Sequence, residues 1–264
     1  MRLGLPADEV HLWCADADTA IDHDNAQHDA LRLRYRALLS EAERSQESRF
    51  RFAKDAERYL LTRALVRTVL SRYVPVGPQD WRFESNAQGK PRIANPEALG
   101  ADLSFNLSHT QGLVVLAVAA GLALGVDVEH MGSGTSRMEV AAACFSATEN
   151  ADLQGLVGAA QEQRFFQYWT LKESYIKARG LGLDIPLQQV SFQLQPPHGV
   201  NLSLHSSLRD AAARWAFWQF QPTAQHMVSL CAERQVERVL TPVWRKTIPL
   251  QGEAWPMQVE RVRT

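Results

Sequence analysis

The sequence predicts an α+β fold of two similar halves, each running from a strand through helices to three further strands. Three observations support this prediction. The 264 residues are 45% hydrophobic and 22% charged, which is typical of a globular protein with a substantial core. Apolar residues recur with helical spacing in some segments and alternate as in strands in others. The order of segments begins again after the turn at Ala120-Gly121.

The first half contains a long basic helix behind an amino-terminal strand. Between residues 59 and 69, apolar positions recur at intervals of three to five, which predicts a helix with an apolar stripe flanked by basic side chains. Pro75 and Gly77 end this helix. The predicted elements are a strand at 10–15, helices at 31–39 and 54–73, and strands at 81–84, 103–106 and 113–119.

The second half repeats this order, and a proline-rich segment follows it. The predicted elements are a strand at 124–129, helices at 138–144, 148–157 and 161–178, and strands at 190–194, 215–219 and 227–232. We therefore expect an amino-terminal subdomain at 1–122 and a carboxy-terminal subdomain at 123–238. Three prolines and two tryptophans favour an extended tail at 239–264, laid over the surface through its aromatic side chains.

Charge, cysteines and apolar runs exclude several classes of protein. The formal net charge is -1, so no global field attracts nucleic acid or an anionic membrane, and any anion site must be local. The three cysteines lack the spacing of a zinc site, which predicts reduced thiols in the cytoplasm. Acidic residues interrupt the amino terminus before any signal-peptide core develops. The apolar run 113–126 is too short to span a bilayer and is interpreted as two buried strands.

Two carboxylates lie on one face of a predicted strand. In Gly125-Val126-Asp127-Val128-Glu129, strand alternation directs both acids one way and both valines toward the core. Neighbouring like charges repel, and a cation between them relieves the repulsion. Oxygen ligands favour magnesium over zinc. The alternative is an exposed, polar strand end.

A third acid, Glu173, lies beside a lysine on the predicted helix at 161–178. Glu173 and Lys177 are four residues apart, hence one turn apart on the same face. One interpretation is a simple ion pair contributing a few tenths of a kcal/mol. In the other, Glu173 completes a three-carboxylate metal site and Lys177 binds a phosphate.

Two short polar motifs complete the set of candidates. Ser108 and His109 follow a short strand, at a position where functional residues often collect, and His109 could donate to phosphate oxygens. The alternative is a capping or turn role for Ser108 and an ordinary hydrogen-bonded His109 without a function. In Gly89-Lys90-Pro91 the glycine allows a tight turn and the proline stiffens the chain, although many loop lysines serve only solubility.

Together these motifs resemble the surfactin-synthetase-activating (Sfp-type) 4'-phosphopantetheinyl transferases. The resemblance covers roughly residues 10–235, and its specificity comes from the order of the motifs. They are Trp81-Arg82-Phe83, Gly89-Lys90-Pro91, Phe105-Asn106-Leu107-Ser108-His109, Gly125 to Glu129, Phe145-Ser146-Ala147-Thr148-Glu149, and Trp169 to Lys177 with Gly180-Leu181-Gly182-Leu183. Gln88 departs from the family pattern, which often has a basic residue there, and Cys144 replaces an aromatic or aliphatic residue.

The resemblance implies that the phosphopantetheine arm of coenzyme A is transferred to a serine of an apo acyl or peptidyl carrier protein. Adenosine 3',5'-bisphosphate is released. The implied Mg²⁺ ligands are Asp127, Glu129 and Glu173. The implied catalytic residues are Glu173, Lys177 and His109, with Glu173 or a metal-bound water as the base for the carrier serine. The implied coenzyme A contacts are Lys54, Lys90, Pro91, Ser108, His109 and Lys177.

The resemblance also implies an architecture and partners. The two halves would form a pseudo-dimer with the active site in the cleft between them, the first half contacting the nucleotide and the second holding the metal. The carrier would dock near residues 180–208, where Leu181, Leu183, Ile185 and Leu187 either contact it or belong to the core. A monomer that binds neither nucleic acid nor membrane is expected.

Two other functions are compatible with the same residues. Three carboxylates and a lysine could serve a magnesium-dependent phosphodiesterase or nuclease. The near-zero net charge argues against that function, as does His130-Met131 in place of an x-Lys ending after the acidic pair. The other alternative is a non-catalytic scaffold that binds a carrier or a nucleotide.

Overall fold

In the described part of the chain, the first half runs from a strand through three helices and a hairpin to an antiparallel strand pair. The computed structural model describes residues 2–17, 26–132, 137–197, 199–235, 238–252 and 254–262. The elements are β1 (Glu9–Asp16), α1 (Ala26–Ala37), α2 (Glu41–Glu47), α3 (Ala53–Leu70), β2 (Phe83–Ser85), β3 (Pro91–Ile93), β4 (Leu103–Thr110) and β5 (Leu113–Ala120).

The second half has the same order of elements. They are β6 (Leu124–His130), α4 (Arg137–Cys144), α5 (Ala147–Gln154), α6 (Gly158–Arg179), β7 (Val190–Gln195), β8 (Gly199–Leu204), β9 (Trp215–Thr223) and β10 (His226–Glu233). Short 3-10 turns lie at Pro78–Asp80, Pro96–Ala101, Gly182–Asp184, Leu187–Gln189, Ser206–Leu208 and Ala212–Arg214. The predicted α+β class is confirmed, although the sequence analysis did not predict α2, β3 or β8.

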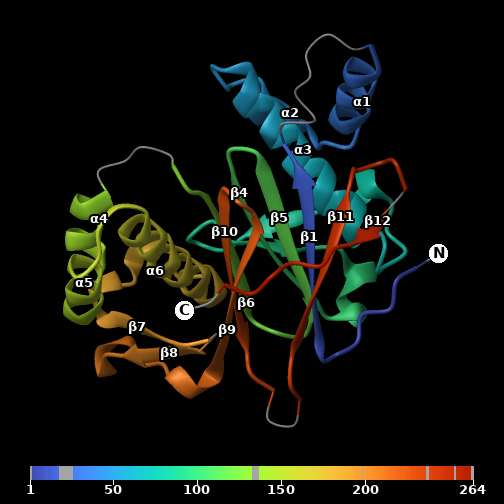
Figure 1. Cartoon of the computed structure of the whole chain (residues 1–264). Helices are drawn as coiled ribbons and strands as arrows, with labels where there is room; N and C mark the ends of the chain where they lie inside the picture. Colours follow the sequence, from blue (N-terminus) through green and yellow to red (C-terminus); the bar gives the residue numbers. More distant parts are fainter. Residues whose placement is uncertain are drawn as a thin grey trace.

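The strand order within the sheets also matches between the halves. In the first half β1 pairs with β5 and β5 with β4, and in the second half β6 pairs with β10 and β10 with β9, all antiparallel. Helices α4, α5 and α6 lie together on one side of the central strands. Helices α1, α2 and α3 form a separate group, apart from α4, α5 and α6 (Figure 1). Among the residues that the structure describes, no helix has both the length and the apolar character needed to cross a membrane.

Part of the segment 239–264, predicted to form an extended surface tail, adds two strands to the first sheet. Strand β11 (Thr241–Thr247) pairs in parallel with β1, and β12 (Ala254–Pro256) pairs with β11, which gives the order β12-β11-β1-β5-β4 (Figure 1). Trp244 is buried, with its ring 5.3 Å from that of Phe220. The free edge of β1 explains why β11 pairs there, because an unpaired strand edge gains hydrogen bonds by adding a strand.

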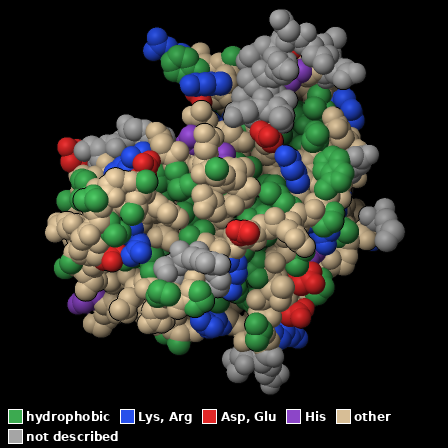
Figure 2. All heavy atoms as spheres, in the orientation of Figure 1, with side chains coloured by type: hydrophobic (Ala, Val, Ile, Leu, Met, Phe, Trp, Pro, Cys, Tyr) green, Lys and Arg blue, Asp and Glu red, His purple; other side chains and the backbone are tan. Residues whose placement is uncertain are grey.

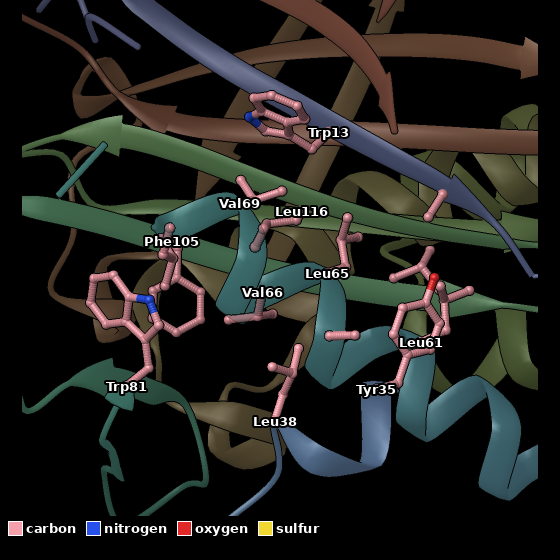
Figure 3. Packing of buried hydrophobic residues seen from close by; sticks show 14 of the residues in the cluster. Trp13, Tyr35, Leu38, Leu61, Leu65, Val66, Val69, Trp81, Phe105 and Leu116 are labelled. Carbon is pink, nitrogen blue, oxygen red and sulfur yellow. The ribbon is translucent and has the colours of Figure 1, made fainter. Parts of the chain in front are cut away.

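Apolar clusters lie on both faces of the first sheet. On one face, α3 packs against β1 and β5 through residues that include Leu65, Trp13 and Leu116 (Figure 3). On the other face, a second cluster takes residues from both halves, among them Val115 of β5 and Val126 of β6. The two halves therefore share a core, and the predicted boundary at 122 separates topological units that pack together.

Side chains connect β4 to β6 across the junction of the halves. The Asn106 side-chain oxygen accepts the Val126 N–H at 2.8 Å, and the Thr110 hydroxyl accepts the His130 N–H at 3.2 Å. Between them, the Ser108 hydroxyl accepts the Val128 N–H, also at 3.2 Å. Alternate residues of β4 thus satisfy backbone donors of β6 and fix its register.

Candidate active site

The two acids of β6 face helix α6, as the strand alternation predicts. Val126 and Val128 point into the shared core, so Asp127 lies on the opposite face of the strand. Gly125 permits a close approach of α6, because a Cβ there would lie 2.1 Å from the Ser174 carbonyl oxygen and 2.4 Å from the Ala178 nitrogen. This approach brings Lys177 of α6 into contact with Asp127.

Asp127 is the most buried of the three predicted metal ligands, with 3% of its surface exposed. Its Oδ1 accepts a hydrogen bond from the Ser108 hydroxyl at 3.0 Å and one from Lys177 Nζ at 2.6 Å. Its Oδ2 is buried and, within the described residues, has no hydrogen-bond partner. An unpartnered buried carboxylate oxygen is costly unless a ligand occupies it.

The other two acids are close enough to Asp127 for their charges to interact. Burial, followed by the charge of Asp127, raises the pKa of Glu129 to about 7, despite a 3.1 Å hydrogen bond from Trp169 Nε1 to Glu129 Oε1. Burial and the same aspartate raise the pKa of Glu173. The charge of Lys177 opposes both increases, but the net shift of each pKa is upward. One lysine therefore faces three carboxylates, and this corner of the molecule has an excess of negative charge.

This donor set fits a magnesium ion. It consists of carboxylate oxygens, one of them the unpartnered Oδ2 of Asp127, and hard divalent cations prefer such ligands. In the described ranges, however, no three acidic, histidine or cysteine side chains form a preassembled metal cluster. The convergence of residues 127, 129 and 173 on one ion therefore stays a prediction, and what supports it is the effect of the Asp127 charge on the pKa values of Glu129 and Glu173.

Positive charge lies next to the acids, around His109. The His109 side chain is exposed at the surface, near the end of β4. Partial desolvation, followed by the charges of Arg58 and Lys177, lowers its pKa. Arg63 contributes in the same direction. Figure 2 shows histidine side chains gathered in this region and basic side chains above it, over the α2–α3 turn.

An open pocket of ≈ 700 Å³ lies beside this positive region in the first half. It has aromatic residues, a glycine turn and several arginines in its wall. The lining includes Tyr59, Arg63, Trp81, Phe83, Gly89 and Pro91. Gly89 has a φ of 83°, a conformation that favours glycine. Arg63 lines the pocket and its charge also lowers the pKa of His109, so the pocket lies within electrostatic range of His109, although none of the three acids lines it.

Three of the predicted coenzyme A contacts have different protein surroundings, and their contact with coenzyme A stays a prediction. Lys54 is exposed in the first turn of α3 and is not part of the pocket wall. Lys90 Nζ donates to the backbone carbonyls of Leu124 at 3.0 Å and Ala178 at 3.2 Å, and burial lowers its pKa to about 8. The Ser108 hydroxyl bonds to protein groups. Lys90 and Ser108 thus hold β6 and α6 together.

Sequence reasoning missed the role of the Phe145 to Glu149 motif. Ser146 caps α5 by accepting the Glu149 N–H, and the Glu149 carboxylate in turn accepts the Ser146 N–H at 2.7 Å. The same carboxylate forms an ion pair with Lys172 at 2.8 Å, and both side chains are 0% exposed. The spacing Ser-x-x-Glu was the available signal, since it is typical of a helix amino terminus. This motif therefore fixes α5 against α6 from within.

The segment predicted to contact a carrier is only partly exposed. Leu181 is exposed, whereas Ile185 and Leu187 are buried in the core of the second half. The side chain of Leu183 lies outside the described residues. Of the two alternatives left open by the sequence, the core role holds for Ile185 and Leu187.

Comparison with known proteins finds a family match in each half of the chain. The profile of the 4'-phosphopantetheinyl transferase superfamily matches residues 123–231, and the profile of the 4'-phosphopantetheinyl transferase N-terminal domain matches residues 27–121. A phosphopantetheinyl transferase of Thraustochytrium sp. is 34% identical over 219 residues, which cover 79% of this chain and 75% of the relative.

Two further relatives show the same relationship. The 4'-phosphopantetheinyl transferase HetI of Nostoc sp. is 30% identical, over 84% of this chain and 86% of its own. The 4'-phosphopantetheinyl transferase Sfp of Bacillus subtilis is 34% identical, over 66% of this chain and 75% of its own. The family suggested by the motif order is thereby confirmed, and the chain belongs to the 4'-phosphopantetheinyl transferase superfamily.

Proposed function

We propose that this chain transfers 4'-phosphopantetheine from coenzyme A to a serine of an apo carrier protein, with the reaction centred on Asp127, Glu173 and Lys177. The family and its named relatives support the activity itself. The observation that carries the assignment of the site is the Asp127–Lys177 contact, with an unpartnered carboxylate oxygen on one side and a positive region on the other.

The nucleotide part of coenzyme A occupies the pocket of the first half. Tyr59, Trp81 and Phe83 offer aromatic surface for a base, and Arg63 offers a guanidinium for a phosphate. Pro91 lies in the same wall, as the resemblance implies. Lys54 would approach a phosphate only from outside this wall.

The active site lies between the two halves, which act as a pseudo-dimer. The repeated strand order supports this arrangement, as does the junction of β4 with β6. His109 comes from the first half, whereas Asp127, Glu129, Glu173 and Lys177 come from the second.

The residues of this chain bind and orient both reactants. Lys177 retains one ammonium N–H beyond its two hydrogen bonds, and this group can bind a phosphoryl oxygen. His109 carries no charge near neutral pH because its pKa is lowered, so it acts by donating an N–H. Asp127, Glu129 and Glu173 would hold Mg²⁺, which when bound neutralises charge that develops on the phosphoryl oxygens.

Glu173 is the base for the carrier serine. A carboxylate within hydrogen-bond reach of the serine hydroxyl can accept its proton as the new bond forms. The serine oxygen loses its proton to Glu173 and forms a bond to the β-phosphorus of coenzyme A. The bond from that phosphorus to the bridging oxygen breaks, and adenosine 3',5'-bisphosphate leaves. Positioning and electrostatic stabilisation dominate such reactions.

The decisive experiment incubates the protein with apo carriers, coenzyme A and Mg²⁺ and follows the carrier mass. We expect a gain of one phosphopantetheine group on at least one acyl or peptidyl carrier. Unchanged masses across a panel of apo carriers that a known transferase does modify would contradict the proposal. We further propose a cytoplasmic monomer to which the carrier docks near residues 180–208, where Leu181 is exposed.

A further inference from the structure

We propose that Ser108 is a positioning residue, whose hydroxyl aligns Asp127 and Lys177 for reaction and does not bind coenzyme A. The inference rests on the proposed function, and it revises the role that the family resemblance implies for this serine. It follows from the hydrogen-bonding capacity of a single hydroxyl group.

The Ser108 hydroxyl already has every partner that it can accommodate. A serine hydroxyl offers one donor and two acceptor sites. Its proton is donated to Asp127 Oδ1 at 3.0 Å. Its lone pairs accept the Val128 N–H at 3.2 Å and the Lys177 ammonium at 2.8 Å. A phosphate oxygen could bond to Ser108 only by displacing Asp127, since a phosphate oxygen needs the proton.

The same contacts decide which atoms face the substrates. Asp127 Oδ1 accepts from both Ser108 and Lys177, so the carboxylate rotamer is fixed and Oδ2 is left without a partner among the described residues. Lys177 uses two of its three N–H groups on Ser108 and Asp127. The hydroxyl thus leaves Asp127 Oδ2 and one N–H of Lys177 available for bonds to ligands.

The position of Ser108 in the fold is suited to this task. Asn106, Ser108 and Thr110 alternate along β4, and each accepts one backbone N–H of β6. Of these three, Ser108 is the residue whose side chain also contacts the Asp127–Lys177 pair. It is buried, with 6% of its surface exposed, so its geometry is set by the junction of the two halves.

Ser108→Ala tests the proposal, and Thr110→Val is the matched control. Both changes remove a hydroxyl that accepts a β6 N–H, but only the first affects Asp127 and Lys177. For Ser108→Ala we expect kcat to fall about 10- to 100-fold and the KM for coenzyme A to stay within about threefold, as for other residues that orient metal ligands. Thr110→Val should change either constant by less than about threefold.

A second readout does not depend on turnover. Titration with Mn²⁺ alone, followed by the paramagnetic signal of the free ion, measures the dissociation constant of the site. Ser108→Ala should raise this constant about 10-fold relative to wild type and to Thr110→Val. Ser108→Thr, which keeps the hydroxyl, should restore most of both losses. If Ser108→Ala does not fold, the near-isosteric Ser108→Cys should give losses in the same direction.

The outcomes separate this inference from the proposed function. A rise in the KM for coenzyme A with unchanged kcat and unchanged Mn²⁺ affinity would assign Ser108 to substrate binding and overturn the inference. Losses of equal size in Thr110→Val would reduce Ser108 to a junction residue and overturn it also. If wild type modifies no carrier, the proposed function fails, whereas the Mn²⁺ titration still tests the alignment of Asp127.

Discussion

Two lysines on helix α6 form ion pairs that differ in what they leave unsatisfied. Lys172 is 0% exposed and donates to Glu149 and to the backbone carbonyls of Leu187 and Val190. Lys177, five residues later, is 28% exposed and donates to Asp127 and Ser108. The first pair has no bonding capacity left, so it stabilises the fold. The second retains an N–H on the lysine and an oxygen on the aspartate, so it can bind substrates.

The largest effect is expected from breaking the buried Lys172–Glu149 pair, called the closed pair below. Lys172→Met leaves the Glu149 carboxylate buried without its counterion, and we expect a loss of about 3–5 kcal/mol in the free energy of unfolding. Urea unfolding measures this loss. The double variant with Glu149→Gln should recover part of it, because no buried charge remains. A stability for Lys172→Met within error of wild type would show that the pair contributes nothing.

Breaking the Lys177–Asp127 pair, called the open pair below, should reduce activity more than stability. Lys177→Met removes a group that faces the substrates, so we expect kcat/KM to fall about 10²- to 10³-fold. The loss in the free energy of unfolding should be smaller than for Lys172→Met, because Lys177 is 28% exposed and the buried Asp127 keeps its hydrogen bond from Ser108. Steady-state transfer to a carrier and urea unfolding give the two numbers. Near-normal transfer would remove Lys177 from the site, and the same test applies to Asp127→Asn and Glu173→Gln.

A change in the spacing of β6 and α6 should disturb the open pair without touching its side chains. Gly125→Ala places a Cβ against the backbone of α6, and we expect a loss of about 1–3 kcal/mol together with most of the activity. Gly155→Ala is the control, since its Cβ would meet its nearest neighbour at 3.4 Å and should be tolerated. Full activity in Gly125→Ala would show that α6 can move away freely.

The smallest effect concerns Lys90, a half-buried lysine whose ammonium donates to two backbone carbonyls. Below about pH 8 it is charged in both states, and burying that charge costs stability. Between about pH 8 and its ordinary pKa of 10.5, the unfolded chain holds a proton that the folded chain has lost. The free energy of unfolding therefore rises with pH across this range, relative to Lys90→Met. Equal slopes for both proteins would show that the lysine pKa is unshifted.

Local periodicity was enough to predict which residues share a face. Strand alternation placed Asp127 and Glu129 opposite the core valines, and the one-turn spacing placed Glu173 beside Lys177. These predictions hold because they depend on neighbours within a single element. The capping box of α2, between Ser40 and Glu43, was also readable but was missed.

Contacts between elements were not predictable in this way. Lys172 and Lys177 belong to the same helix. Nothing in their spacing shows that Lys172 is buried among backbone carbonyls and that Lys177 is partly exposed beside Asp127. Ser108 gains its partners from β6 and α6, which lie 19 to 69 residues away in the sequence. Strand β3 has three residues and begins with Pro91, so it carries too little alternation to be recognised.

The parallel pairing of β1 with β11 has a consequence for synthesis of the protein. Glu9 pairs with Thr241, so one of the earliest strands to leave the ribosome acquires a neighbour only after more than two hundred further residues have been translated. Until then one border of the nascent sheet is uncovered and open to mispairing with other chains. A chain whose translation ended before β11 would contain the acids and the lysine of the proposed site but would leave this edge of β1 unpaired.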